Sequence, residues 1–133
     1  MTAFRAMLDT NIISALMRQD SLWYRAEAYG PENLCTSLVV AAELRFGAVR
    51  RKSARLKREV DEILARIAVL PLEPPVDLIY ADIRSRLQEA GTPIGPNDLW
   101  IAAHAVALDL TLITANLGEF SRVPGLRVES WVD

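Results

Sequence analysis

Apolar and polar residues follow two different periods along this chain of 133 residues. Short apolar runs have the length of buried strands, and they fall at residues 4–8, 34–36, 69–72, 111–114 and 126–131. Between them, apolar residues recur at helical intervals, which predicts helices at residues 12–19, 21–29, 38–67, 76–90 and 97–108. We expect the helix at 38–67 to break near residues 50–53, where a basic cluster follows Gly47. Residues 115–120 are expected to form a turn, with room for one helical turn.

Strands that alternate with helices predict an α/β fold with a parallel sheet covered by helices on both faces. The length and the hydrophobic content of 51% suit one globular domain over residues 1–133. No signal peptide and no run of about 18 apolar residues is present, so we expect a cytoplasmic protein that does not enter a membrane. The single cysteine, Cys35, lies in an apolar run and is expected to be buried in the core.

Three apolar segments each contain a carboxylate, at Asp9, Glu43 and Asp98. Taken alone, Asp9 is equally consistent with a helix cap, and Asp98 with a favourable charge at a helix start, which contributes roughly 0.3–1 kcal/mol. Glu43 is different, because its neighbours at helical spacing are apolar: Val39, Val40, Phe46 and Gly47. Burying an ionised carboxylate costs several kcal/mol unless it is paired. Glu43 therefore indicates a functional site.

If the three carboxylates converge, they need a cation. Two like charges about 5 Å apart repel by roughly 3 kcal/mol at an effective dielectric constant near 20. Ligand sets made only of oxygen favour Mg²⁺ or Mn²⁺ over zinc. Such an ion can activate a water molecule for attack on a phosphodiester. The pattern therefore predicts phosphoryl hydrolysis.

Four segments in this order resemble the PIN-domain ribonucleases of the virulence-associated protein C (VapC) toxin type: MLDTNIISAL, VVAAELRFGA, IGPNDLWIAAHAVAL and LTLITANLGEFSRVPGLRVESW. The resemblance covers essentially the whole chain. It implies a three-layer α/β/α sandwich with a central, mostly parallel five-stranded sheet. It also implies a metal-dependent endoribonuclease that leaves a 5′ phosphate and acts as the toxin of a toxin–antitoxin pair. The expected partners are an RNA substrate, a small antitoxin protein and a second copy of the chain.

The resemblance places the catalytic and metal-binding acids of the family at Asp9, Glu43 and Asp98. The chain departs from the family at Asn116, where many members have Asp, and Glu119 is the candidate for the missing fourth carboxylate. Several short polar residues lie beside these positions and suit hydrogen bonds to the ligands, or equally capping and turn formation: Thr10, Asn11, Ser37, Thr114 and Asn116.

Two groups of basic residues are candidates for contact with RNA. Arg84 and Arg86 lie close in sequence to the loop before Asp98. Residues 45–58 contain seven of the 15 lysine and arginine residues, and these either bind RNA phosphates, bind an acidic segment of the antitoxin or form a solvated helix face. The one histidine, His104, is expected to pack in the core, because it points away from the helix face of Asp98.

Two other functions remain open at this point. One is a binding module that keeps the PIN fold but has a weak or inactive metal site, which Asn116 leaves possible. The other is a phosphatase of the haloacid-dehalogenase type, which also begins with an apolar strand ending in Asp. That class needs a second Asp two residues later, where this chain has Asn11.

Overall fold

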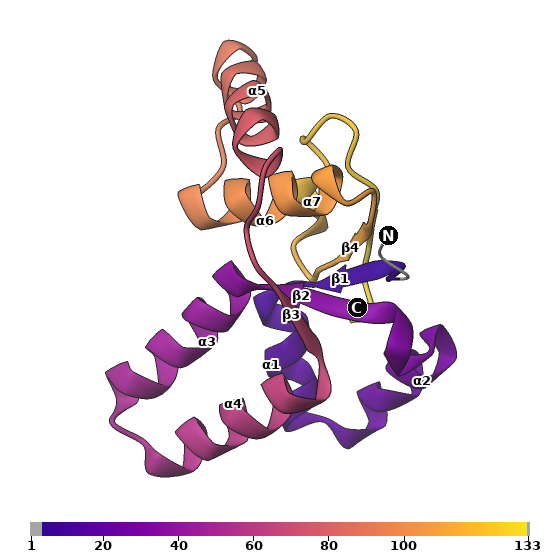
Figure 1. Ribbon diagram of the computed structural model, residues 1–133, viewed down its shortest axis with the longest axis vertical. Coiled ribbons are helices and arrows are strands. Elements are labelled where there is room, and N and C mark those ends of the chain that lie inside the picture. Colours follow the sequence, from indigo (N-terminus) through magenta and orange to yellow (C-terminus); the bar gives the residue numbers. More distant parts are fainter. Residues whose placement is uncertain (1–3, 133) are drawn as a thin grey trace.

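One sheet of five parallel strands forms the centre of the computed structural model, which describes residues 4–132 (Figure 1). The strands are β1 (Ala6–Leu8), β2 (Leu34–Ser37), β3 (Ala68–Leu70), β4 (Thr111–Ile113) and β5 (Val128–Glu129). Their order across the sheet is β3-β2-β1-β4-β5, and every neighbouring pair is parallel. All five predicted strands are therefore confirmed. Strand β2 ends one residue later than predicted, at Ser37, and β3 begins one residue earlier, at Ala68.

The helices form the two outer layers of the molecule. They are α1 (Thr10–Arg18), η1 (Asp20–Leu22), α2 (Trp23–Tyr29), η2 (Pro31–Asn33), α3 (Leu38–Arg51), α4 (Ala54–Arg66), α5 (Val76–Glu89), α6 (Pro96–Ala107) and α7 (Leu117–Phe120). Helices α1 to α4 lie on one side of the sheet and α5 to α7 on the other (Figure 1). This arrangement confirms the predicted three-layer α/β/α sandwich.

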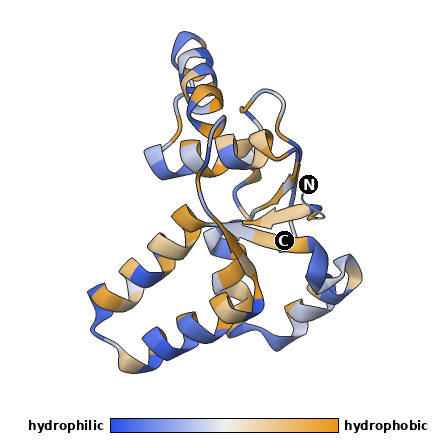
Figure 2. Cartoon of the chain, viewed as in Figure 1, coloured by the Kyte–Doolittle hydropathy of each residue, from blue (hydrophilic) through white to orange (hydrophobic). Residues whose placement is uncertain are grey.

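The central strand β1 is buried on both faces. Ala6, Met7 and Leu8 are fully inaccessible to solvent, as expected for a parallel strand between two helical layers. Met7 lies beside Cys35 of β2 and Leu112 of β4. The strands are coloured as hydrophobic in Figure 2, whereas hydrophilic residues gather on the outer helices. The hydrophobic core therefore lies along both faces of the sheet. Cys35 is buried in it as predicted, and this burial raises the pKa of its thiol to about 12.

The predicted break in the helix at 38–67 falls between α3 and α4. Lys52 ends α3 in the left-handed region at φ 53°. The Ser53 side chain then accepts a hydrogen bond from the Leu56 amide at 3.0 Å and caps α4. The two helices consequently fold back as a hairpin that projects from the sheet (Figure 1).

Helix α1 begins two residues earlier than the hydrophobic pattern predicts. Its first residue is Thr10, because Asp9 accepts a hydrogen bond from the Thr10 amide at 2.8 Å and acts as the N-cap. Helix α6 likewise begins with Pro96 at its first position. Within residues 4–132, none of the helices has both the length and the apolar character that a membrane span requires.

Candidate active site

Asp9 stands at the carboxyl end of the central strand, next to the end of β4. It is 3% exposed, and both of its carboxylate oxygens accept hydrogen bonds. Oδ1 accepts from the Thr10 amide at 2.8 Å, while Oδ2 accepts from the Thr114 hydroxyl at 2.8 Å and from Asn11 Nδ2 at 3.3 Å. Asn11 also accepts a hydrogen bond from the Ala115 amide at 2.9 Å. Residues from α1 and from the end of β4 thus hold the Asp9 side chain in one orientation.

Glu43 reaches the same edge of the sheet from α3. Its Oε1 accepts a hydrogen bond from the Thr10 hydroxyl, and its Oε2 accepts from Asn97 Nδ2 at 3.3 Å. These contacts join α1, α3 and the first turn of α6. The apolar helix face that the sequence predicts around Glu43 is only partly present, because Val40 is buried but Phe46 is 66% exposed.

Asp98 and Glu119 complete a group of four carboxylates. Asp98 lies in the first turn of α6, within hydrogen-bonding reach of Glu119 on α7. Glu119 accepts hydrogen bonds from the Gly95 amide at 3.2 Å and from Asn116 Nδ2 at 2.5 Å. Asn116 therefore contacts the candidate fourth acid instead of replacing it. We refer to Asp9, Glu43, Asp98 and Glu119 as the carboxylate cluster.

The carboxylate cluster is electrostatically unfavourable in the absence of a cation. Burial raises the pKa of Asp98 to about 7, and the charges of Glu119, Asp9 and Glu43 contribute to this rise. Burial also raises the pKa of Asp9 above its usual value, with a further contribution from Glu43, although the hydrogen bonds from Thr114 and Thr10 oppose this effect. The four side chains therefore influence one another, with Asp9, Glu43 and Asp98 being the predicted acids and Glu119 the candidate for the fourth.

Comparison with known proteins identifies the family. The PIN domain model matches residues 6–126. Ribonuclease VapC2 of Rickettsia felis is 36% identical over 129 residues, which span 94% of this chain and 96% of that protein. The chain belongs to the VapC-type PIN-domain ribonucleases. The tRNA(fMet)-specific endonuclease VapC of Salmonella typhimurium is 34% identical over the same shares of the two chains. In the crystal structure of VapBC2 from R. felis bound to a promoter DNA fragment, one chain matches with a TM-score of 0.89 and 33% identity, over 97% of this chain and 100% of that chain.

The donor set of this VapC-type chain fits a hard divalent cation. All four members of the carboxylate cluster offer oxygen, which Mg²⁺ and Mn²⁺ prefer. A cation would also relieve the mutual repulsion that raises the pKa of Asp98. As the side chains lie, no three Asp, Glu, His or Cys residues among 4–132 form a ready-made metal site. The carboxylates are instead turned toward the hydrogen-bond donors described above.

Ser37 and His104 contact each other away from the carboxylate cluster. Ser37 caps α3 by accepting a hydrogen bond from the Val39 amide at 3.1 Å, and its hydroxyl lies 2.9 Å from His104 Nδ1. His104 is 1% exposed, which agrees with its predicted packing role, and burial lowers its pKa. Ser37 thus contacts a core histidine, and its hydrogen bonds within residues 4–132 do not include the carboxylates.

Arg84 and Arg86 both lie on α5 but differ in their surroundings. Arg84 lines a cavity of about 290 Å³ together with Pro93 and Ile94 of the loop before α6 and Pro96 at the start of α6. Arg86 is instead paired with Asp82, with 3.2 Å between Nε and Oδ2. The sequence did not single out Asn97, although it contacts Glu43. The sequence feature that could have pointed to Asn97 is its position directly before the predicted metal ligand Asp98.

Proposed function

We propose that this VapC-type chain is a divalent-metal-dependent endoribonuclease and that the carboxylate cluster is its active site. The observation that carries the proposal is that Asp9, Glu43, Asp98 and Glu119 come from four different segments, at the starts of α1 and α6, within α3 and in α7, and meet at the carboxyl edge of one parallel sheet. That edge, between β1 and β4, is where the order of the strands reverses, and open α/β sheets bind ligands at such a point. The proposed ion is Mg²⁺ or Mn²⁺.

Asp9 and Asp98 are the proposed direct ligands of the ion, with Glu43 and Glu119 binding it directly or through water. When bound, the ion supplies positive charge that acidifies a coordinated water molecule and stabilises a phosphodiester under attack. Thr114 and Asn11 hold Asp9 in position through their hydrogen bonds at 2.8 and 3.3 Å. Asn116 and the Gly95 amide do the same for Glu119.

The proposed substrate is RNA, and transfer RNA is the first class to test, since the S. typhimurium relative is a tRNA(fMet)-specific endonuclease. Purified protein is incubated with total RNA and with Mg²⁺, Mn²⁺ or a chelator, and the cut ends are mapped. We expect cleavage with either metal, 5′ phosphates on the products and no cleavage with chelator or in Asp9→Asn. Asp20→Asn, which changes an exposed acid, is the matched control and should cleave normally. Metal binding without any cleavage would instead support an inactive binding module.

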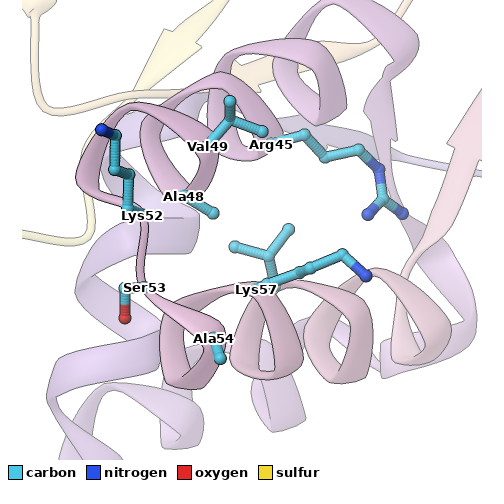
Figure 3. A pocket seen from close by; sticks show the side chains of 8 residues that line it. Arg45, Ala48, Val49, Lys52, Ser53, Ala54 and Lys57 are labelled. Carbon is cyan, nitrogen blue, oxygen red and sulfur yellow. The ribbon is translucent and has the colours of Figure 1, made fainter.

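The proposed protein partner is an antitoxin. The R. felis structure to which this chain is similar is that of VapBC2, and VapBC is a family of toxin–antitoxin systems. The present chain has a groove of about 290 Å³ between α3 and α4. Ala48 and Val49 form apolar parts of its wall, and Lys52 and Lys57 lie at its rim (Figure 3). Within residues 4–132 neither lysine is in an ion pair, so an acidic amphipathic segment fits this groove. Lys52→Glu combined with Lys57→Glu should weaken binding of the antitoxin, measured by calorimetry, without changing RNA cleavage.

We also propose that the chain forms a homodimer in the cytoplasm. Leu78 on α5 is 71% exposed and Leu38 at the start of α3 is 51% exposed. Such side chains supply apolar area for association. Sedimentation should give a dimer for the unchanged protein and a monomer for a variant with Leu78→Glu, and a variant that stays dimeric would exclude Leu78 from the interface.

A further inference from the structure

A cavity of about 350 Å³ opens beside the carboxylate cluster, between α1, α3 and α4. We call it the α1–α3 cavity. Thr10 and Glu43, which hydrogen-bond to each other, form part of its wall, so it adjoins the cluster directly. Arg18 and Arg51 also line it, and they are the last residues of α1 and α3. Arg18 follows Thr10 by eight residues in α1, and Arg51 follows Glu43 by eight residues in α3. At about 1.5 Å per helical residue, each arginine begins about 12 Å along its helix from the carboxylate cluster.

The α1–α3 cavity is lined by two acids, Glu43 and Glu59, and by two arginines, Arg18 and Arg51. Glu43 is held by Thr10 and Asn97, and Glu59 is paired with Arg55, with 2.8 Å between the charged atoms. Arg18 and Arg51 are exposed, and neither forms an ion pair or a side-chain hydrogen bond within residues 4–132. These guanidinium groups are therefore available to an anion from outside the protein.

The α1–α3 cavity also has an apolar part. It is formed by Met17, Leu44, Leu56 and Val60, and so it offers a surface on which a planar base can pack. The cavity thus combines an acid cluster, an apolar wall and unpaired guanidinium groups in one continuous space.

Gly47 keeps the middle of this cavity open. It follows Glu43 by one helical turn, and a Cβ built at this position has nothing within 4 Å. Glycine inside a helix is less favourable than alanine, so the stability of α3 does not explain this residue. The space that a side chain would occupy here is the space of the α1–α3 cavity itself.

We propose that the α1–α3 cavity is a subsite for a nucleotide next to the scissile phosphate. Arg18 and Arg51 contact a backbone phosphate there, and the apolar wall receives the neighbouring base. This inference rests on the proposed ribonuclease function, because it assumes that RNA crosses the carboxylate cluster. It adds two residues, Arg18 and Arg51, that hold the substrate away from the reacting phosphate.

The first test measures the binding of a labelled single-stranded oligoribonucleotide by fluorescence anisotropy at several salt concentrations. The full chain carries Asp98→Asn, so that the RNA stays intact. Arg51→Ala should weaken binding roughly tenfold, as expected for the loss of a charged hydrogen bond. It should also reduce the slope of log K against log salt by about 0.7, and by about 1.4 together with Arg18→Ala. Arg50→Ala is the matched control, because Arg50 is an exposed neighbour that does not line the cavity.

The second test fills the cavity. Gly47→Leu places a side chain in the open space and should lower RNA affinity at least as much as Arg51→Ala, whereas urea unfolding should show no loss of stability. Arg51→Ala and Gly47→Leu variants that bind RNA like their parent, with the same salt slope, would overturn the subsite and leave a peptide of the antitoxin as the occupant. Cleavage by the protein with Asp98 intact is measured in parallel. If that protein fails to cleave RNA with Mg²⁺ or Mn²⁺, the proposed function itself is wrong, and the subsite with it.

Discussion

Replacement of Asp98 by asparagine should stabilise the metal-free protein while it removes activity. The carboxylate cluster gathers four acids, and Asp98 experiences both burial and the charges of Glu119, Asp9 and Glu43. Asparagine has nearly the same shape and carries no charge. It keeps an amide that can donate a hydrogen bond to Glu119, in the way that a protonated Asp98 does. The repulsion therefore disappears without a cavity in the core.

The size and the pH dependence of this effect follow from the pKa of Asp98. A rise from 3.8 to about 7 corresponds to roughly 4 kcal/mol. Asp98 is only partly buried, so screening by water reduces this value, and we expect a gain of about 1–2 kcal/mol. Because its pKa is higher in the folded state than in the unfolded state, the stability associated with Asp98 is present below about pH 4. It is lost as the pH rises to about 7, so the variant should gain most above that pH.

The assay is urea unfolding of the unchanged protein and of Asp98→Asn in chelator, at pH 4.5 and pH 8. Asp77→Asn is a matched control, because Asp77 also lies in the first turn of a helix but is exposed. It should lose about 0.3–1 kcal/mol through the helix dipole, with little change between the two pH values. A variant with Asp98→Asn that is less stable than the unchanged protein at pH 8 would refute the reasoning, since Asp98 would then be favourably placed without an ion.

Three further predictions concern the surroundings of the site and the core. Thr114→Val removes the hydrogen bond of 2.8 Å to the buried Asp9, and it should lower the free energy of unfolding by about 1–3 kcal/mol in calorimetry; an unchanged value would mean that water replaces the hydroxyl. Glu119→Gln should weaken Mn²⁺ binding more than Asn116→Ala, because only Glu119 contributes a charge; the reverse order would contradict its role as the fourth acid. Burial raises the pKa of Cys35 to about 12, so a thiol reagent at pH 8 should modify it only after unfolding, and rapid reaction in the native protein would contradict the buried position.

The sequence predicted the order of the elements well, because the apolar runs and the helical periods are distinct. The break between α3 and α4 was predictable from the basic cluster after Gly47. The start of α1 was not predictable in this way, because the apolar pattern begins at Ile12 whereas the helix begins at Thr10, directly after its N-cap Asp9. Asp9 in fact combines both interpretations that its sequence left open, since it caps α1 and also belongs to the cluster.

The sequence could propose the acids of the candidate site but not the contacts that surround them. The sequence places Glu43 on an apolar helix face that includes Phe46, yet Phe46 is exposed and the contacts of Glu43 are polar. Asn97 and the pairing of Asn116 with Glu119 depend on how α6 and α7 approach each other. The cavity between Arg18 and Arg51 depends on how α1 lies against the α3–α4 hairpin. Such contacts between distant segments leave no local pattern in the sequence.

The most direct test of the carboxylate cluster is a titration of the protein with Mn²⁺, followed by electron paramagnetic resonance of the free ion. The unchanged protein should bind Mn²⁺ saturably, and Mg²⁺ should compete for the same site. Asp9→Asn should abolish this binding while it leaves the far-ultraviolet circular dichroism unchanged, and the exposed-acid control Asp20→Asn should bind normally. Equal Mn²⁺ binding by Asp9→Asn and by the unchanged protein would contradict the claim that these carboxylates hold the ion.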